Sequence, residues 1–380
     1  MSTLLVDIGP LGSCCSDHVL ETMHKALSEG EGEGIFAKHH SSYVTDLIEE
    51  VYGHGTKALN GLSQDLLGWL QERAQKKFTP IPTPERYLVW SSEKAEKVFT
   101  YLSRKPQVNW SASDYMLMAD YLVHSWFPET MPGAMADLAA KKGAIMGKVQ
   151  AVHEGITPGE AMALLSYLST PSKAASVLSM AEINEDIISY GMAHCSDAVT
   201  GFTEGVRHQI KRLILDHEKG VRLGGVVRSE NLQTKLFDAF ADFNRDWRRI
   251  AVTEVGEMAN QGFIAGLEPG KKVKRVEQYL GACPFCLKID GVVALVVDPR
   301  KADKNWDTEI WAGKDNVGRS ASAYKRIGGT LVKRSDDELW KLPAGLAHPH
   351  CRGTWISLDG PAVDDKFTLW LDGLFKQVKG

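Results

Sequence analysis

The chain has 380 residues, of which 43% are hydrophobic and 24% are charged, and its formal net charge at pH 7 is −4. These values are ordinary for a soluble globular protein and leave room for two or three domains. No stretch approaches the roughly eighteen consecutive apolar residues of a membrane span, and the N-terminus lacks the basic and apolar regions of a secretory signal. We therefore expect that the protein is synthesised in the cytoplasm and does not contact a membrane.

Charge is unevenly distributed along the chain. Residues 1–200 contain 15 basic and 24 acidic residues, whereas residues 201–360 contain 26 basic and 21 acidic residues. The later part is basic enough to contact phosphate, but it falls short of the charge density of a dedicated nucleic-acid-binding protein.

The first part of the chain is expected to be helical. From about Ser41, apolar residues recur at helical spacing, and the pattern stops before a proline-rich stretch at residues 78–86 that we interpret as a linker. Residues 1–86 are thus predicted to form an N-terminal helical region and a linker.

Residues 87–200 carry several helix start signals. Ser111 and Asp114 have the spacing of a capping box, in which two side chains satisfy free backbone N–H groups. Thr157 and Glu160 repeat that spacing, with a proline at the first helical position. Short helices with short connections predict a compact helical domain.

Long amphipathic helices are predicted over residues 201–270. An apolar and aromatic stripe at steps of three and four is typical of a core face or a helix–helix contact, and it comprises Leu232, Leu236, Phe240, Phe243, Trp247 and Ile250. Arg245, Arg248 and Arg249 lie nearby. We interpret these arginines as part of a solvated face, with contact to a partner or to DNA as the alternative.

Two pairs of metal-binding residue types stand out in the later part of the chain. Cys283 and Cys286 are separated by two residues, and His348 and Cys351 repeat this spacing after 61 intervening residues. Tetrahedral sets of thiolate and imidazole favour zinc, so we predict a Zn²⁺ site made by these four side chains. Four protein donors leave no open position for water, which indicates a structural rather than a catalytic ion.

Other interpretations of these residues stay open. The thiols can lack a metal, with or without one disulfide among them, or the metal can be catalytic. His350 is a second candidate for the imidazole ligand. It is adjacent to Cys351, however, and two neighbouring residues are poorly placed to bind the same ion. Six cysteines in 380 residues are too few for a disulfide scaffold, and a reducing compartment favours metal over a bridge.

Strand-like apolar runs flank the predicted zinc site, at about residues 273–279, 292–297 and 353–358. Residues 299–345, between the two pairs of ligands, are polar and show little periodicity. We predict a zinc-braced α+β module over 271–360 and a C-terminal helix in 361–380. The expected fold class is therefore mainly α with a small C-terminal α+β zinc-braced module.

The order of motifs in residues 230–358 resembles the phage Mu protein F-type head-morphogenesis domain. The residues that carry this resemblance are Asn260-Gln261-Gly262 near the end of a helix, Cys283-Pro284-Phe285-Cys286, Ile289-Asp290-Gly291 and His348-Pro349-His350-Cys351-Arg352. The family usually has a second cysteine directly after this arginine, where the present chain has Gly353. The segment between the ligand pairs is also longer than expected for the family, and residues 1–200 lie outside the resemblance.

The resemblance implies a structural virion protein: a minor head (minor capsid) protein of a tailed phage, close to the portal, that acts in head assembly or in DNA passage. The implied partners are portal and capsid proteins and packaged DNA, with multiple copies of the chain per particle. The implied location is the virion, in the head interior or portal region, with the host cytoplasm as the place of assembly.

Two alternatives to this structural role are kept. One is a zinc-containing nucleic-acid-processing enzyme, nuclease-like, with its chemistry in the loop between the ligand pairs. The other is a zinc-stabilised adaptor that binds host proteins. The motif templates for common catalytic sites fail, and no residue stands out as a nucleophile or a base; we therefore expect no catalytic residues.

Overall fold

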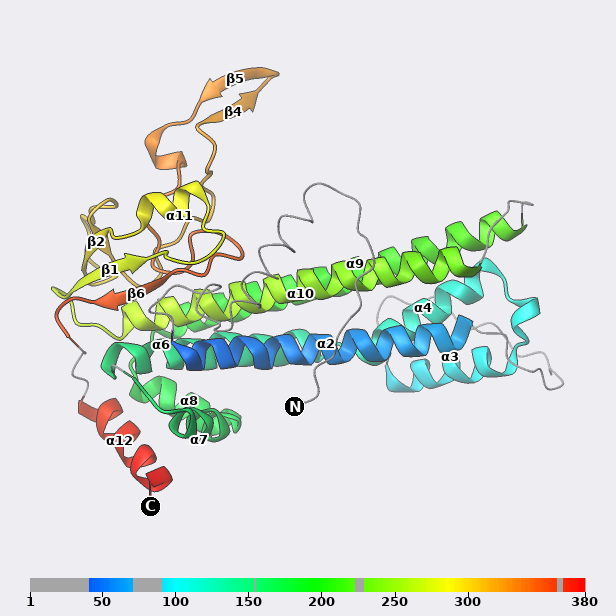
Figure 1. The fold of residues 1–380 in the computed structure, drawn as a ribbon, viewed down its shortest axis with the longest axis horizontal. Helices are drawn as coiled ribbons and strands as arrows, with labels where there is room; N and C mark the ends of the chain where they lie inside the picture. Colours follow the sequence, from blue (N-terminus) through cyan, green and yellow to red (C-terminus); the bar gives the residue numbers. More distant parts are fainter. Residues whose placement is uncertain (1–40, 71–90, 154, 223–228, 361–364, 380) are drawn as a thin grey trace. The chain divides into compact units, whose positions relative to one another are not determined.

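The computed structural model describes residues 41–70, 91–153, 155–222, 229–360 and 365–379. It is mainly helical, with a small sheet region near the C-terminus (Figure 1), so the coarse fold class predicted from the sequence is confirmed. The linker predicted at residues 78–86 and the first forty residues lie outside the described ranges.

The helices are given first in chain order. They are α2 (Ser42–Leu70), α3 (Ser92–Arg104), η2 (Gln107–Asn109), α4 (Ala112–Trp126), α5 (Met131–Ala136), the π-helical η3 (Asp137–Lys142), α6 (Gly143–Val152), α7 (Pro158–Leu168), α8 (Pro171–Met180), α9 (Glu185–Arg222), α10 (Ser229–Ala265), α11 (Pro284–Ile289), η4 (Asp336–Glu338) and α12 (Asp365–Lys379). The strands are β1 (Lys272–Val276), β2 (Val293–Val296), β3 (Glu309–Ile310), β4 (Tyr324–Ile327), β5 (Thr330–Lys333) and β6 (Thr354–Ser357).

Spatial proximity divides the chain into two compact units. Among the described residues, the first unit combines 41–45, 143–187 and 256–379, and the second combines 46–142 and 188–255. Each unit therefore draws on stretches that are distant in the sequence, and the candidate metal ligands all belong to the first unit.

Both predicted capping boxes are present. The side chain of Ser111 accepts a hydrogen bond from the backbone N–H of Asp114, and the Asp114 carboxylate accepts one from the N–H of Ser111 at 2.6 Å. Thr157 and Glu160 make the same reciprocal pair at the start of α7, where the N–H of Thr157 lies 2.8 Å from the glutamate oxygen. Because these contacts are local, the sequence is enough to predict them.

The second unit is centred on Trp247 of α10, whose side chain is fully buried. Its indole Nε1 donates to the carbonyl of Val51 in α2 at 3.1 Å, and Gly55 leaves space for the ring, because a Cβ at that position would collide with it. The predicted apolar stripe is confirmed as a core face at its buried members, which are Leu232, Leu236, Phe243 and Trp247.

The first unit contains a close helix contact between α6 and the last part of α10. A Cβ built on Gly147 would overlap the carbonyl oxygen of Ala259, and one built on Gly262 would overlap that of Ala144. The obstacles are backbone atoms, so a side chain at either position forces the two helices apart. These glycines set the distance between the helix that supports the sheet and its neighbour.

Gly147→Ala is therefore expected to destabilise the first unit by about 1–3 kcal/mol, because overpacking at a helix contact cannot be relieved by moving a side chain. The matched control is Gly53→Ala in the middle of α2, where a Cβ meets nothing within 4 Å. That change is expected to stabilise the protein by up to about 1 kcal/mol through helix propensity. Urea unfolding of both variants measures the difference, and equal effects would contradict the tight contact.

The sheet of the first unit has the strand order β3-β2-β1-β6. Strand β1 is antiparallel to both β2 and β6, and β2 is parallel to the short β3. The predicted strands around 273–279, 292–297 and 353–358 are thus confirmed, with boundaries shifted by a few residues. Asn260 of α10 donates to the carbonyl of Gly353 at 2.9 Å, which ties the helix to the start of β6.

The long segment between the two ligand pairs is held by a buried lysine. Lys314 is 1% exposed, and its Nζ donates to the carbonyls of Trp306 at 2.7 Å and Glu309 at 2.8 Å. The same ammonium lies over the rings of Trp306 and Trp311, and burial lowers the pKa of Lys314 to about 8. A buried polar anchor therefore helps to order a segment that shows little periodicity in its sequence.

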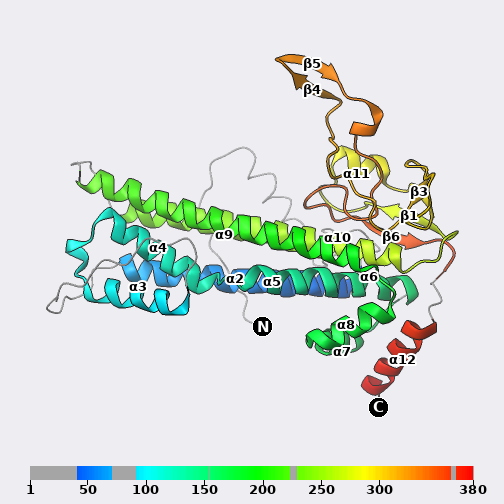
Figure 2. The same cartoon turned by 180° about the vertical axis from the view of Figure 1, so that it is seen from behind.

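Helix α12 packs against α7 and α8 within the first unit, as the view from behind shows (Figure 2). Trp370 lies against Tyr167 with ring centroids 5.5 Å apart, and Phe367 and Leu371 are fully buried. A helix is present at the predicted C-terminal position, starting at Asp365.

Candidate metal centre

The first pair of ligands lies at the start of α11. Cys283 is the N-cap residue, and its Sγ accepts a hydrogen bond from the backbone N–H of Cys286 at 3.5 Å. Pro284 occupies the first helical position, where its fixed backbone angle is already suited to a helix. This short turn brings both thiols to the same side of the helix end.

The second pair of ligands meets the first. The Nε2 atom of His348 is 3.2 Å from the Sγ of Cys283 and 3.2 Å from the Sγ of Cys286, and the Sγ atoms of Cys286 and Cys351 are 3.8 Å apart. Zinc bond lengths of about 2.0–2.3 Å in a tetrahedron place donor atoms roughly 3.6–3.8 Å from one another. The distance between Cys286 and Cys351 matches this spacing, and the two distances to His348 are shorter. Cys283, Cys286 and His348 form one group of mutually close donors, which Cys351 joins through Cys286, and this cluster is able to hold a metal ion.

His348 is oriented by two neighbours. Its Nδ1 lies 2.8 Å from the carbonyl oxygen of Pro349, and its ring stacks on Trp340 with centroids 5.7 Å apart. Because a carbonyl only accepts, Nδ1 carries the proton and Nε2 presents its lone pair to the two thiols. The segment before it is anchored on α10, where the Glu257 carboxylate accepts from the N–H of Leu346 at 2.6 Å.

His350 is directed elsewhere. It has a positive φ of 65°, and its Nε2 lies 2.8 Å from Nη2 of Arg352. Among the described residues, only His348 brings an imidazole into the group with Cys283 and Cys286. The choice between the two histidines that the sequence left open is therefore decided by the geometry.

His348→Ala is expected to weaken metal binding by more than about 100-fold, since loss of a ligand exceeds the 10–100-fold effect of losing an outer-shell partner. His350→Ala, two residues away, is expected to change metal affinity little. Competition with a chromophoric chelator measures both affinities. The reverse order would assign the ligand to His350.

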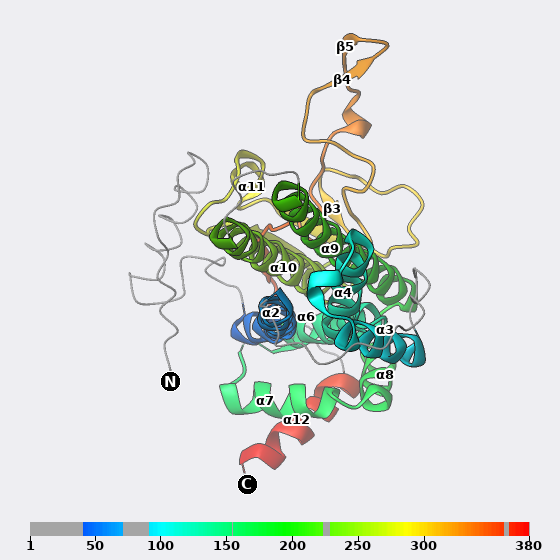
Figure 3. The ribbon, with the colours of Figure 1, turned by 90° about the vertical axis from the view of Figure 1, so that its right-hand side faces the viewer.

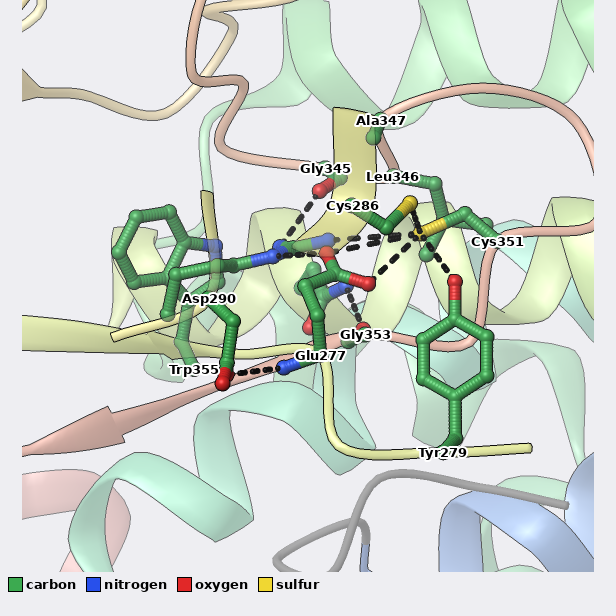
Figure 4. A network of polar contacts seen from close by, with 12 residues as sticks. Glu277, Tyr279, Cys286, Asp290, Gly345, Leu346, Ala347, Cys351, Gly353 and Trp355 are labelled. Carbon is green, nitrogen blue, oxygen red and sulfur yellow. Dashed lines mark hydrogen bonds and ion pairs between the residues drawn. The ribbon is translucent and has the colours of Figure 1, made fainter. Parts of the chain in front are cut away.

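Cys351 belongs to a buried polar network (Figure 4). The guanidinium of Arg275 donates to Glu277 at 2.7 Å, to the carbonyl of Gly345 at 2.9 Å and to the Sγ of Cys351 at 3.7 Å. The hydroxyl of Tyr279 donates to the same sulfur at 3.6 Å. Such donors stabilise a metal-bound thiolate and fix its position.

Arg275 lies on β1 and Glu277 follows directly after the strand; both side chains are fully buried, and the spacing of two residues brings them together in an ion pair at 2.7 Å. Asp290, just after α11, accepts a hydrogen bond from the N–H of Glu277 at 2.9 Å. The sequence did not single out Arg275, Glu277 or Tyr279 as part of the site. The available signal was an arginine and a glutamate at a spacing of two, at the end of a strand that precedes the first cysteine pair.

Glu277 also forms a second group of close donor atoms, with Cys286 and Cys351. Its carboxylate oxygens lie 3.5 and 3.7 Å from the Sγ of Cys351. This carboxylate is already engaged by Arg275, so the arrangement suits a positioning role better than direct ligation. Gly353 leaves the necessary space, because a Cβ there would overlap the carboxylate.

The thiols differ in their electrostatic surroundings. The pKa of Cys351 is raised well above its ordinary value by the hydrogen bond with Cys286 and by burial, although Arg275 opposes this rise. At Cys283, desolvation raises the pKa, but the backbone N–H of Cys286 and the neighbouring His348 outweigh it, so the net pKa is lowered. A bound cation favours the thiolate at both positions and displaces the protons.

Disulfides are absent from this cluster. Cys195, Cys283, Cys286 and Cys351 are all free thiols in the part of the chain that the structure describes. Cys195 is buried in α9 and is not one of the cluster residues, and burial raises its pKa to about 12. It has the character of a small core residue.

The three arginines singled out in α10 are neutralised locally. Arg245 pairs with Asp242 at 2.9 Å, Arg249 pairs with Asp246 at 3.3 Å, and Arg248 pairs with Glu49 at 3.0 Å. These ion pairs are consistent with the solvated-face interpretation and remove the basis for a basic patch there.

Comparison with protein-family models, with curated proteins and with solved structures gives no match to this chain. No helix within the described ranges has the length and apolar character needed to cross a membrane.

Proposed function

We propose that Cys283, Cys286, His348 and Cys351 bind one Zn²⁺ ion and that this ion braces the module of residues 271–360. The observation that carries the proposal is that the fourth side of the cluster is taken by the buried Cys351, which lies 3.8 Å from Cys286. A site closed by four protein donors holds structure, because no coordination position remains for a reacting water.

The donor set supports zinc over other ions. Three thiolates and one imidazole are soft and borderline ligands, which magnesium and calcium do not prefer. The Arg275 guanidinium offsets part of the negative charge that three thiolates bring. In this proposal the ion connects α11 directly to the segment before β6, which is distant from it in the sequence.

We further propose that the chain is a minor head protein of a tailed phage, located near the portal and acting in head assembly or DNA passage. The resemblance described above supports this role. Three of the residues that carry the resemblance also make contacts that stabilise the first unit. Asn260 ties α10 to β6, Gly262 permits the contact with α6, and Asp290 fixes the backbone at Glu277.

The experiment that tests the head role is mass spectrometry of purified phage particles produced from a genome that encodes this chain. The expected result is several copies per particle, retained after nuclease treatment and cross-linked to portal subunits. Absence from particles would contradict the proposal. Metal-dependent cleavage of DNA by the purified chain would favour the nuclease alternative, and capture of a host protein without particle association would favour the adaptor.

A further inference from the structure

The hairpin β4–β5 extends away from the four-stranded sheet of the first unit, as two views at right angles show (Figures 1 and 3). The two strands form a sheet of their own, and every residue of β5 is exposed. Gly328 and Gly329 form the two-residue turn, with φ values of 55° and 86°. The tip therefore carries no side chains, and the hairpin has no core.

The hairpin lies in a part of this module that is rich in basic residues and has no acidic ones. Residues 316–335 contain five lysines or arginines and no aspartate or glutamate. This density is local: it is hidden in the mild charge excess of residues 201–360. A slender element with one sign of charge points to a partner of the opposite sign.

The pairing register sorts the side chains onto two faces. Tyr324 lies opposite Lys333 and Arg326 lies opposite Leu331, so these four residues share one face. All four are exposed. Neither Arg326 nor Lys333 forms an ion pair with any residue in the described ranges.

The opposite face is already neutralised at its base. Lys325 forms an ion pair with Glu338 of η4, and Arg334, just after β5, lies 3.7 Å from the same carboxylate. Arg319 also holds the base, donating to the carbonyls of Asp337 and Leu339. The anions at the base thus fix the hairpin and leave one cationic face free.

We propose that the β4–β5 hairpin binds duplex DNA through Arg326 and Lys333. The major groove of B-DNA is about 12 Å wide and admits a two-stranded β-ribbon, and long cationic side chains reach the phosphates at its edges. A protein partner fits less well, because the four exposed apolar residues are divided equally between the faces: Tyr324 and Leu331 on one, Ile327 and Val332 on the other.

This inference goes beyond the proposed function, because it depends on the hairpin and not on the metal site or on a role in a phage head. A chain absent from particles can still bind DNA in this way, and a head protein can lack DNA binding. The two proposals therefore fail separately.

The test is fluorescence anisotropy of a mixed-sequence duplex of about 30 base pairs with the full chain, between 50 and 200 mM salt. The variant is Arg326→Gln with Lys333→Gln. The matched control is Lys235→Gln with Lys376→Gln, two exposed lysines whose loss changes the net charge equally. Circular dichroism melting checks that both variants are folded.

The hairpin variant is expected to bind about 10-fold or more weakly at 0.1 M salt, with a salt slope reduced by about 2, since each phosphate contact contributes about 0.9. The control is expected to stay within about twofold. In the unaltered chain, duplex DNA is expected to protect Arg326 and Lys333 from trypsin, a result that does not depend on any variant folding.

Three results would overturn the proposal. One is the absence of duplex binding at micromolar concentrations of the unaltered chain. Another is an equal loss in the hairpin and control variants. The third is a change of ligand. Either the unaltered chain binds a single strand of the same length more tightly than the duplex, or the hairpin variant loses binding to a protein partner while it still binds DNA.

Discussion

Replacing Cys283 and Cys286 together by serine is expected to release the metal and to unfold the module of residues 271–360. Structural zinc contributes roughly 10–16 kcal/mol of apparent binding free energy in small zinc-dependent domains, more than any single packing contact. Here Cys283, at the N-cap of α11, and Cys286, within the helix, supply two of the four candidate donors. We expect about one equivalent of zinc in the purified chain and less than half in the variant, together with a lower melting temperature.

Elemental analysis by mass spectrometry, on protein purified without chelator in a reducing buffer, measures the metal. The matched control is Cys195→Ser, which also removes a buried thiol but lies outside the cluster; it is expected to keep the zinc. A chelator is expected to lower the melting temperature of the unaltered chain and to leave the double variant unchanged. Zinc below half an equivalent in the unaltered chain, or unchanged in the variant, would refute the site.

Arg275→Met is expected to destabilise the protein by about 3–5 kcal/mol, because it leaves the Glu277 carboxylate buried without its partner. Both side chains are fully buried, and their 2.7 Å contact is reinforced by the bond from Arg275 to Gly345. The same change removes a donor to Cys351, so zinc affinity is expected to fall by about 10–100-fold. Urea unfolding and chelator competition measure the two effects.

Two companion variants separate the causes. Arg275→Met with Glu277→Leu removes both charges and is expected to recover much of the stability, since an apolar replacement of a buried pair is often neutral. Arg300→Met breaks an exposed pair with Asp298, 3.3 Å apart, and is expected to cause no measurable change. If the double variant were as unstable as the single one, the unpaired carboxylate would not be the cause.

The local features of the fold followed from the sequence. Capping boxes at Ser111 and Thr157 depend on residues three positions apart, and the strands around Val273 and Val293 are short apolar runs near turn residues. The meeting of the four donor side chains also followed, because donor chemistry and repeated spacing narrow the candidates. In each case, the information lies within a few neighbouring residues.

The residues around the candidate ligands could not be predicted from the sequence, because their positions depend on the pairing of distant segments. Arg275 faces Trp355 only because β1 and β6 are paired in that register. The role of Lys314 depends on the folding of two tryptophans around it, in a segment whose polarity suggested only a loop. The sequence alone does not distinguish a buried charged residue from a solvated one, because burial depends on segments that are distant in the chain.

Gly353 is sterically coupled to residue 277 and, through it, to the charge at residue 275. Any side chain at 353 would enter the space of the Glu277 carboxylate, and a change of Glu277 alone would leave Arg275 buried without its counter-charge. Positions 275, 277 and 353 are therefore coupled. A side chain at 353 requires a shorter residue at 277, and an uncharged residue at 277 requires the loss of the charge at 275.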